Sequence, residues 1–147
     1  MTNQVKILEG IKIVDLTRVY TGPFCTQILA DMGATIIKIE DAGPASNERT
    51  WPPFAPGTEE ATYFIGLNRG KRSIELNLKK QKAKDIFYKL VNEADVVIEN
   101  FAPGVADRLS IGYKDCKKIK NDIIYVSISA FGQYGPYSKL PGFDMLA

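Results

Sequence analysis

A chain of 147 residues is the size of one domain, and its 45% hydrophobic content supplies enough apolar side chains for a buried core. The net charge of +2 is too small to indicate a nucleic-acid or anionic-membrane surface. The sequence contains no histidine, which excludes Ser-His-Asp and Cys-His catalysis and nearly every zinc-hydrolase arrangement. Any catalysis would therefore have to use carboxylates, lysines, tyrosines, hydroxyl groups or backbone donors.

The sequence shows no pattern of a membrane or secreted protein. No apolar run is long enough to span a bilayer, and the first ten residues, MTNQVKILEG, lack the apolar centre of a signal peptide. Cys25 and Cys116 lie in unrelated helical contexts, which favours two free thiols over a disulfide or a metal site. We therefore expect a cytoplasmic protein without bound metal and without a membrane or nucleic-acid partner.

Residues 11–40 predict a strand, a turn, a helix and a second strand. The runs IKIVDL and TIIKIE are nearly continuous in apolar residues, which is typical of strands covered on both faces. Pro23 is expected at the first helical position, and Gly33 is expected to end the helix. One helical face is expected to be buried, and it carries Phe24, Cys25, Ile28, Leu29 and Met32.

This arrangement also predicts a ligand site. Two buried strands joined by one helix form a right-handed crossover, so the strands are parallel. The turn 17–23 then lies at the carboxyl ends of the strands, where open α/β sheets bind ligands. The N-terminus of the helix behind the turn suits an anion such as a phosphate, because its backbone N–H groups and its dipole both favour negative charge.

Residues 41–60 predict an irregular segment, because three closely spaced prolines exclude a regular helix or a central strand. Such a long loop is often functional. The alternative is a surface excursion that packs through Trp51 and Phe54.

Residues 74–94 predict a half-buried strand and then an amphipathic helix. Ile74, Leu76 and Leu78 alternate with polar residues, as in a strand with one buried face. Apolar residues at helical spacing follow, namely Ala83, Ile86, Phe87, Leu90, Val91 and Ala94. Lysines at 79, 80, 82 and 84 crowd the start of this helix, where positive charge is unfavourable. They form either a solvated face or part of an anion site, with the basic residues 69, 71 and 72 assisting.

The rest of the chain continues the alternation of strands and helices. Residues 95–101 predict a buried strand that leads into the turn 102–104, and 123–130 predict another strand rich in β-branched residues. A short helix through Arg108 and a second helical stretch around Lys117 lie between them. A glycine-containing loop follows, and residues 142–147 resemble the start of a helix. The fold class is therefore α/β, a doubly wound, mostly parallel sheet of at least four strands.

A dinucleotide-binding Rossmann domain is the obvious competitor. Glu40 and Asp41 end the second strand, where an acid that binds ribose would lie. The first turn, TRVYTGP, has only Gly22 in place of the pattern G-x-G-x-x-G, and the bulky Tyr20 would block close approach of a pyrophosphate. These features disfavour nucleotide binding of that type.

The sequence resembles the N-terminal part of the family III CoA-transferases, which include formyl-CoA and carnitine CoA-transferases and the related 2-methylacyl-CoA racemases. The matching segments, in family order, are DLTRVYTGPFCTQILADMGATIIKIE, LNRGKRSIELNLK, ADVVIENFAPGVADRL, GYKD, IIYVSISAFGQYGP and PGFD. The resemblance implies that residues 1–147 are the N-terminal part of a large, Rossmann-like CoA-binding domain that is truncated at its C-terminus. It also implies an interlocked homodimer with acyl-CoA and a carboxylic acid as substrates and no permanently bound cofactor.

The resemblance also implies a set of coenzyme A contacts. Asp41 stands where many members have arginine, and an acid cannot pair with a phosphate. The complete set is Arg18, Val19, Tyr20, Thr21, Asp41, Leu76, Asn77, Leu78, Lys79, Asn100, Phe101, Ala102 and Arg108.

No catalytic residue is assigned within the chain. In the family, CoA passes through an anhydride and a thioester on an aspartate, which by resemblance lies beyond residue 147. Asp144 matches a pocket or helix-capping residue, and Asp15 is interpreted as a structural acid at a strand end. The racemases carry histidine where this chain has Phe143, so transfer is favoured over racemisation. The isolated chain is expected to be inactive. A racemase and a non-catalytic CoA-binding fragment stay open as alternatives.

Overall fold

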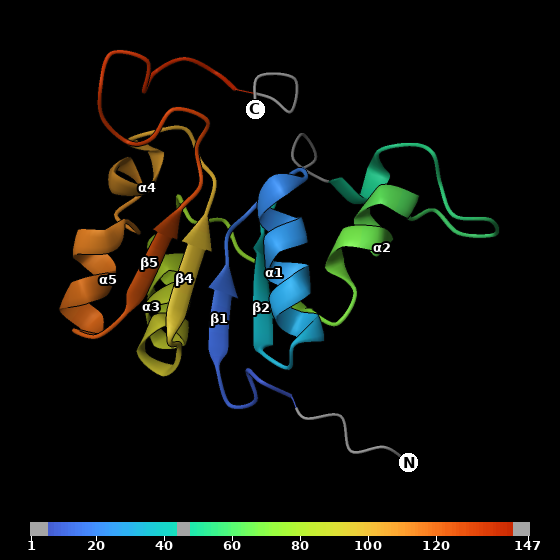
Figure 1. Ribbon diagram of the computed structural model, residues 1–147, viewed down its shortest axis with the longest axis horizontal. Coiled ribbons are helices and arrows are strands. Elements are labelled where there is room, and N and C mark those ends of the chain that lie inside the picture. Colours follow the sequence, from blue (N-terminus) through green and yellow to red (C-terminus); the bar gives the residue numbers. More distant parts are fainter. Residues whose placement is uncertain (1–5, 44–47, 143–147) are drawn as a thin grey trace.

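The computed structural model describes residues 6–43 and 48–142 (Figure 1). Its strands are β1 Lys12–Asp15, β2 Thr35–Glu40, β3 Arg72–Glu75, β4 Val96–Glu99 and β5 Ile124–Ser127. Its helices are α1 Thr21–Asp31, the 3₁₀ helix η2 Glu48–Thr50, α2 Thr62–Asn68, α3 Gln81–Glu93, α4 Val105–Arg108 and α5 Tyr113–Ile119. Among the described residues, no helix has the length and apolar character needed to cross a membrane.

The described strands form one five-stranded parallel sheet in the order β3-β2-β1-β4-β5. The central strand β1 pairs on one side with β2, where Val14 lies opposite Ile37, and on the other with β4, where Val14 lies opposite Val97. The chain therefore winds outward in one direction from β1 to β3 and in the other from β4 to β5. The carboxyl ends of β1 and β4 flank the point where the winding reverses, which is the usual ligand position in such sheets.

Helices cover both faces of the sheet, which confirms the predicted doubly wound α/β fold. On one face, Phe87 of α3 and Cys116 of α5 pack with Leu16 and Val97. On the other face, where α1 lies in front of the sheet in Figure 1, Leu29 packs with the second cluster of buried strand residues, Ile13, Ala34, Ile36 and Ile98. The continuous apolar strand runs are thus explained by burial from both sides.

The prediction of the buried face of α1 is wrong for Phe24, Ile28 and Met32, whereas Leu29 does pack against the sheet. Phe24 and Ile28 are each 43% exposed and Met32 is 37% exposed, whereas Thr26 and Gln27 are buried. The reason is the buried acid beneath the helix, because the Thr26 hydroxyl donates a 2.6 Å hydrogen bond to the Asp15 carboxylate. This bond turns a polar side of α1 toward the sheet.

Several predicted boundaries shift by a few residues. Pro23 is the third residue of α1, still within the first turn, where a missing N–H costs nothing. The strands predicted at 95–101 and 123–130 end at Glu99 and Ser127. The strand predicted through Leu78 ends at Glu75, because the chain then turns across the carboxyl ends of its neighbours. Residues 62–68, for which the sequence pattern predicts no helix or strand, form α2.

The described part of the long segment after β2 makes several local contacts. It contains η2 and an isolated bridge between Phe54 and Ala61, and the Trp51 ring stacks on Tyr63 with centroids 6.2 Å apart. Trp51 and Phe54 are still 39% and 47% exposed. The helix start predicted at 142–147 falls, from Phe143 on, outside the described residues.

Candidate functional site

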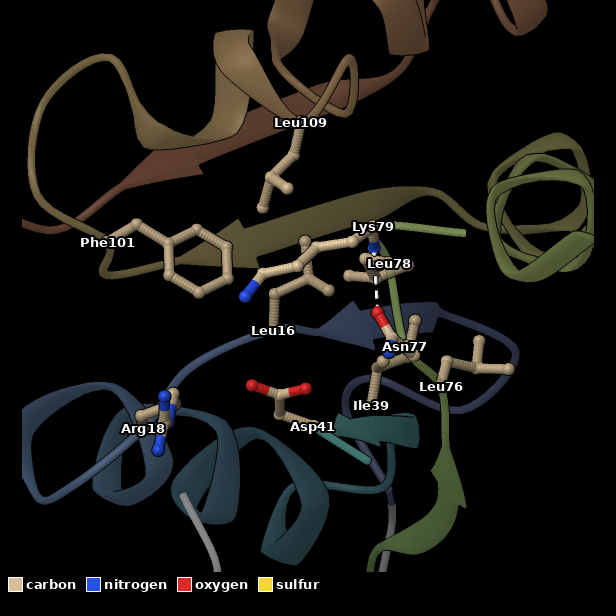
Figure 2. Close-up of a pocket in the computed structure, with 10 residues that line it drawn as sticks. All are labelled: Leu16, Arg18, Ile39, Asp41, Leu76, Asn77, Leu78, Lys79, Phe101 and Leu109. Carbon is tan, nitrogen blue, oxygen red and sulfur yellow. Dashed lines mark hydrogen bonds between the residues drawn. The ribbon is translucent and has the colours of Figure 1, made fainter. Parts of the chain in front are cut away.

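A pocket lies over the carboxyl ends of the parallel strands (Figure 2). It holds about 460 Å³ of empty space, part of which is open to solvent. Its lining is mainly apolar, with a few polar groups at the rim: Leu16, Arg18, Ile39, Asp41, Leu76, Asn77, Leu78, Lys79, Phe101 and Leu109. An apolar slot with a small number of polar groups is the usual composition of a site for a small molecule or cofactor.

The sheet topology explains why these residues meet. Arg18 follows β1, Asp41 directly follows β2, and Phe101 follows β4. Residues 76–79 leave β3 and cross the same edge, where the Leu76 N–H donates to the Glu40 carbonyl at 2.9 Å. Figure 2 shows the Phe101 ring, the Lys79 side chain and the Asp41 carboxylate directed toward one space. Parallel strands deliver their carboxyl ends to one edge, so residues far apart in sequence share one pocket.

The structure brings together many of the contacts that the family resemblance implied. Arg18, Asp41, Leu76, Asn77, Leu78, Lys79 and Phe101 all line this pocket, whereas Val19, Tyr20, Thr21, Asn100, Ala102 and Arg108 do not. Whether any of them binds coenzyme A stays a prediction. Sequence reasoning missed Leu16, Ile39 and Leu109 as pocket residues. Leu16 and Ile39 could have been found as pocket residues, because each is an apolar residue at the end of a predicted strand.

The pocket separates one lysine from the others at the start of α3. Lys79 lines the pocket, and its backbone N–H is fixed by the Asn77 side chain at 3.1 Å. Lys80 and Lys82 are exposed, and neither lines the pocket. Two basic residues before β3 are engaged elsewhere, since Arg69 pairs with Asp31 at 2.6 Å and Lys71 pairs with Asp15 at 3.2 Å. The sequence pattern of many lysines thus resolves into one pocket residue and a solvated face.

The turn after β1 is held from two sides. The Asn100 side chain accepts from the Arg18 N–H and donates to the Arg18 carbonyl, both at 2.8 Å. The next residue, Val19, has φ of +66°, and its N–H donates to Glu48 Oε1 at 2.9 Å. A positive φ is rare for a β-branched residue and costs about 1–3 kcal/mol, so it persists only where the surroundings enforce it.

The backbone donors of this turn divide into two groups. Those of Thr17, Arg18 and Val19 are bonded to the side chains of Asp15, Asn100 and Glu48, respectively. Within residues 6–43 and 48–142, the N–H groups of Tyr20, Thr21 and Gly22 have no hydrogen-bond partner. The backbone donors left for the anion site predicted at the turn 17–23 are therefore fewer than expected, and they belong to Tyr20 and to the first residues of α1.

A buried polar network lies beneath the turn. The Lys71 ammonium contacts the Asp15 carboxylate at 3.2 Å and donates to the Pro23 carbonyl at 2.9 Å, with both charged side chains at most 1% exposed. Burial lowers the pKa of Lys71, although the Asp15 charge opposes this shift. Lys38 donates to the Thr17 carbonyl at 2.6 Å. These contacts support the interpretation of Asp15 as a structural acid, because they fix α1 against the sheet.

Two further acids at the strand ends have opposite pKa shifts. Burial alone would raise the pKa of Glu40, but hydrogen bonds from Arg49 and Ser73 outweigh it and lower the pKa. The Arg49 bonds are bidentate, each 2.8 Å long. Burial raises the pKa of Glu99, even though its carboxylate accepts from the Phe101 N–H at 2.7 Å.

Comparison with known proteins decides the family. The model of CoA-transferase family III matches residues 8–147. The chain belongs to CoA-transferase family III. This agrees with the family that the sequence motifs indicated.

Individual relatives in CoA-transferase family III show how far the similarity extends. The chain is 46% identical over 145 residues to a human protein named succinyl-CoA:glutarate CoA-transferase, covering 99% of this chain and 33% of that protein. It is 46% identical over 138 residues to acetyl-CoA:oxalate CoA-transferase from Acetobacter aceti, covering 94% of this chain and 35% of that protein. The solved structure of a CAIB/BAIF family protein from Brucella suis superimposes with a TM-score of 0.88 at 41% identity. The match covers 97% of this chain and 38% of that chain. The chain thus spans about a third of the length of its curated relatives.

Proposed function

We propose that the intact protein transfers coenzyme A between an acyl-CoA and a carboxylate acceptor. In this proposal, residues 1–147 form the N-terminal part of its CoA-binding domain. The observation that carries the proposal is the pocket at the strand ends, which gathers Arg18, Asn77, Lys79 and Phe101 in a chain of CoA-transferase family III. Its chemistry suits the nucleotide end of coenzyme A.

The two kinds of lining group have separate roles in this proposal. The apolar surface of Phe101 and Leu78 takes the adenine ring, because a flat aromatic base gains most from leaving water against an apolar slot. Lys79 and Arg18 at the rim supply positive charge for the phosphates. The first N–H groups of α1, which follow Arg18 in the chain but do not line the pocket, are further donors for a phosphate.

The chemical step proposed for the family uses an aspartate outside these 147 residues. Its carboxylate attacks the acyl-CoA carbonyl and releases the CoA thiolate, which leaves a mixed anhydride. The thiolate then attacks the aspartyl carbonyl, releasing the donor acid and forming an aspartyl thioester. The acceptor carboxylate and the thiolate repeat these steps in reverse order, which regenerates the aspartate. We accordingly expect no turnover from the isolated chain and an interlocked homodimer in the intact protein.

The acceptor is proposed to be a short dicarboxylate. The relatives bear names that pair a short acyl-CoA with glutarate, oxalate or mesaconate. A cytoplasmic location stays a prediction.

The test separates the two ends of coenzyme A. Calorimetric titration of the intact protein with CoA, 3′,5′-ADP and pantetheine should show that 3′,5′-ADP competes with CoA. Phe101→Ala should weaken CoA and 3′,5′-ADP to a similar extent and leave pantetheine unchanged. Tyr134→Ala is the matched control, because Tyr134 is 89% exposed and does not line the pocket. Unchanged 3′,5′-ADP affinity in Phe101→Ala would place the nucleotide elsewhere.

A further inference from the structure

Val19 occupies a backbone conformation that its own side chain opposes. Its φ of +66° is in the left-handed region, which β-branched residues rarely adopt. The residue is 45% exposed, so packing of the valine side chain does not enforce this conformation. Some other group must hold the turn in place.

Glu48 is the group in contact with this residue. Its Oε1 accepts from the Val19 N–H at 2.9 Å and lies 3.4 Å from Arg18 Nε. The Glu48 side chain is only 5% exposed, although it belongs to η2 in the long segment after β2. A carboxylate is buried to this extent only when hydrogen bonds replace its water.

The neighbouring residue shows that Glu48 is not needed to attach η2 to the sheet. Arg49 already does this through its bidentate bonds to Glu40, and its guanidinium lies 4.1 Å from the Phe64 ring centroid. Glu48 extends in the other direction, to the turn. The two adjacent residues thus connect the sheet, η2 and the strained turn in series.

We propose that Glu48 is a positioning residue for the coenzyme A site. By holding Val19 in the left-handed conformation, it fixes Arg18 at the pocket rim and aims the N-terminus of α1 toward the ligand phosphates. The ligand in this statement rests on the proposed function, whereas the effect of Glu48 on the Val19 backbone does not. A shorter side chain at position 48 lets Val19 relax to negative φ. This relaxation moves Arg18 and the N-terminus of α1. Glycine at position 19 accepts positive φ without strain and removes the need for Glu48.

Two substitutions of Glu48 separate the effect of side-chain length from the effect of side-chain charge. Glu48→Gln keeps an oxygen at the same distance without the charge, and Glu48→Asp keeps the charge but withdraws it by one methylene. In the intact protein we expect Glu48→Asp to raise the Kd for CoA and the KM for acyl-CoA about tenfold with kcat nearly unchanged, as for a lost hydrogen bond to a charged group. Glu48→Gln should stay within about threefold of wild type. The double variant Glu48→Asp/Val19→Gly should recover most of the loss.

Each outcome bears on the proposal. Wild-type affinity in Glu48→Asp, or no recovery in the double variant, overturns it. A larger loss in Glu48→Gln than in Glu48→Asp assigns Glu48 an electrostatic role and also overturns it. If wild type binds no CoA, the proposed function fails, and the crystal structure of Glu48→Asp then tests the positioning directly. Negative φ at Val19 supports the proposal, and an unchanged +66° rejects it.

Discussion

Asn100 and Arg18 are joined by two 2.8 Å hydrogen bonds between the side-chain amide of the first residue and the backbone of the second. The amide acts as donor and acceptor at once, and so it bridges the ends of β1 and β4 in the way a further pair of strand hydrogen bonds would. A carboxylate in its place could accept from the Arg18 N–H but would repel the Arg18 carbonyl.

Asn100→Asp should therefore destabilise the protein by about 1–3 kcal/mol, the usual cost of an unsatisfied and partly buried polar group. It should also weaken CoA binding, because Arg18 lines the pocket. Urea denaturation measures the change in stability, and calorimetric titration with CoA measures the change in binding. Asn121→Asp is the control, since Asn121 is exposed and should change stability by less than about 0.5 kcal/mol. Equal effects of the two substitutions would contradict the role given to Asn100.

The cations near the pocket should differ in their contribution to CoA binding. Lys79→Ala should weaken binding by about 1.5–3 kcal/mol, because Lys79 lines the pocket and can bond a phosphate. Lys82→Ala should change it by less than about 0.5 kcal/mol, because Lys82 is an exposed residue of α3 outside the pocket.

Arg108→Ala tests whether the coenzyme A site extends from the pocket to Arg108. Arg108 is exposed, but it precedes the pocket residue Leu109, and its planar fork suits a phosphate. A loss of about 1.5–3 kcal/mol in CoA affinity is expected. Calorimetric titration of the intact protein with CoA measures this loss of affinity. A loss no greater than that of Lys82→Ala would show that Arg108 does not belong to the site.

The buried pair Asp15–Lys71 should show strong coupling. Lys71→Met leaves the Asp15 carboxylate buried without its cation and should cost about 3–5 kcal/mol of unfolding free energy. The double variant Asp15→Asn/Lys71→Met should be less destabilised than the sum of the single variants. In the exposed pair Lys118–Asp115, the corresponding Lys118→Met should cost less than about 1 kcal/mol. Additive effects at Asp15 and Lys71 would argue against the buried contact.

The pKa of Glu40 predicts how stability depends on pH. This pKa is lowered below its ordinary value of 4.5, so the native state binds fewer protons here than the unfolded chain does. The stabilisation is therefore present above pH 4.5 and is lost as the pH falls through the native pKa. Urea midpoints measured downward from pH 5 should fall less steeply in Glu40→Gln than in wild type.

Glu99 provides a control of opposite sign. Its pKa is raised by burial, so its ionisation opposes folding, and stability is lost as the pH rises from 4.5 through the native pKa. Glu99→Gln should remove this loss. The same pH slope in both glutamine variants would contradict the assigned shifts.

The strands and α3 could be predicted because their residues carry the pattern locally. Val14 and Val97 lie in continuous apolar runs, and Phe87 and Val91 recur at helical spacing. The face of α1 that lies against the sheet could not be predicted, because it depends on a hydrogen bond between Thr26 and the buried Asp15. The pattern of hydrophobic residues does not reveal this bond. The role of Glu48 was equally hidden, since nothing near residue 48 in sequence identifies Val19 as its partner.

The bridge between Asn100 and Arg18 also sets an order of events during biosynthesis. The two residues are 82 positions apart in the chain. At the usual elongation rates of about 5–20 residues per second, the ribosome needs about 4–16 s to reach Asn100 after Arg18 has been made. Throughout that interval the nascent β1–α1 unit lacks the partner that later fixes its turn. A chaperone or protease that meets the emerging chain then encounters a segment whose shape is not yet set.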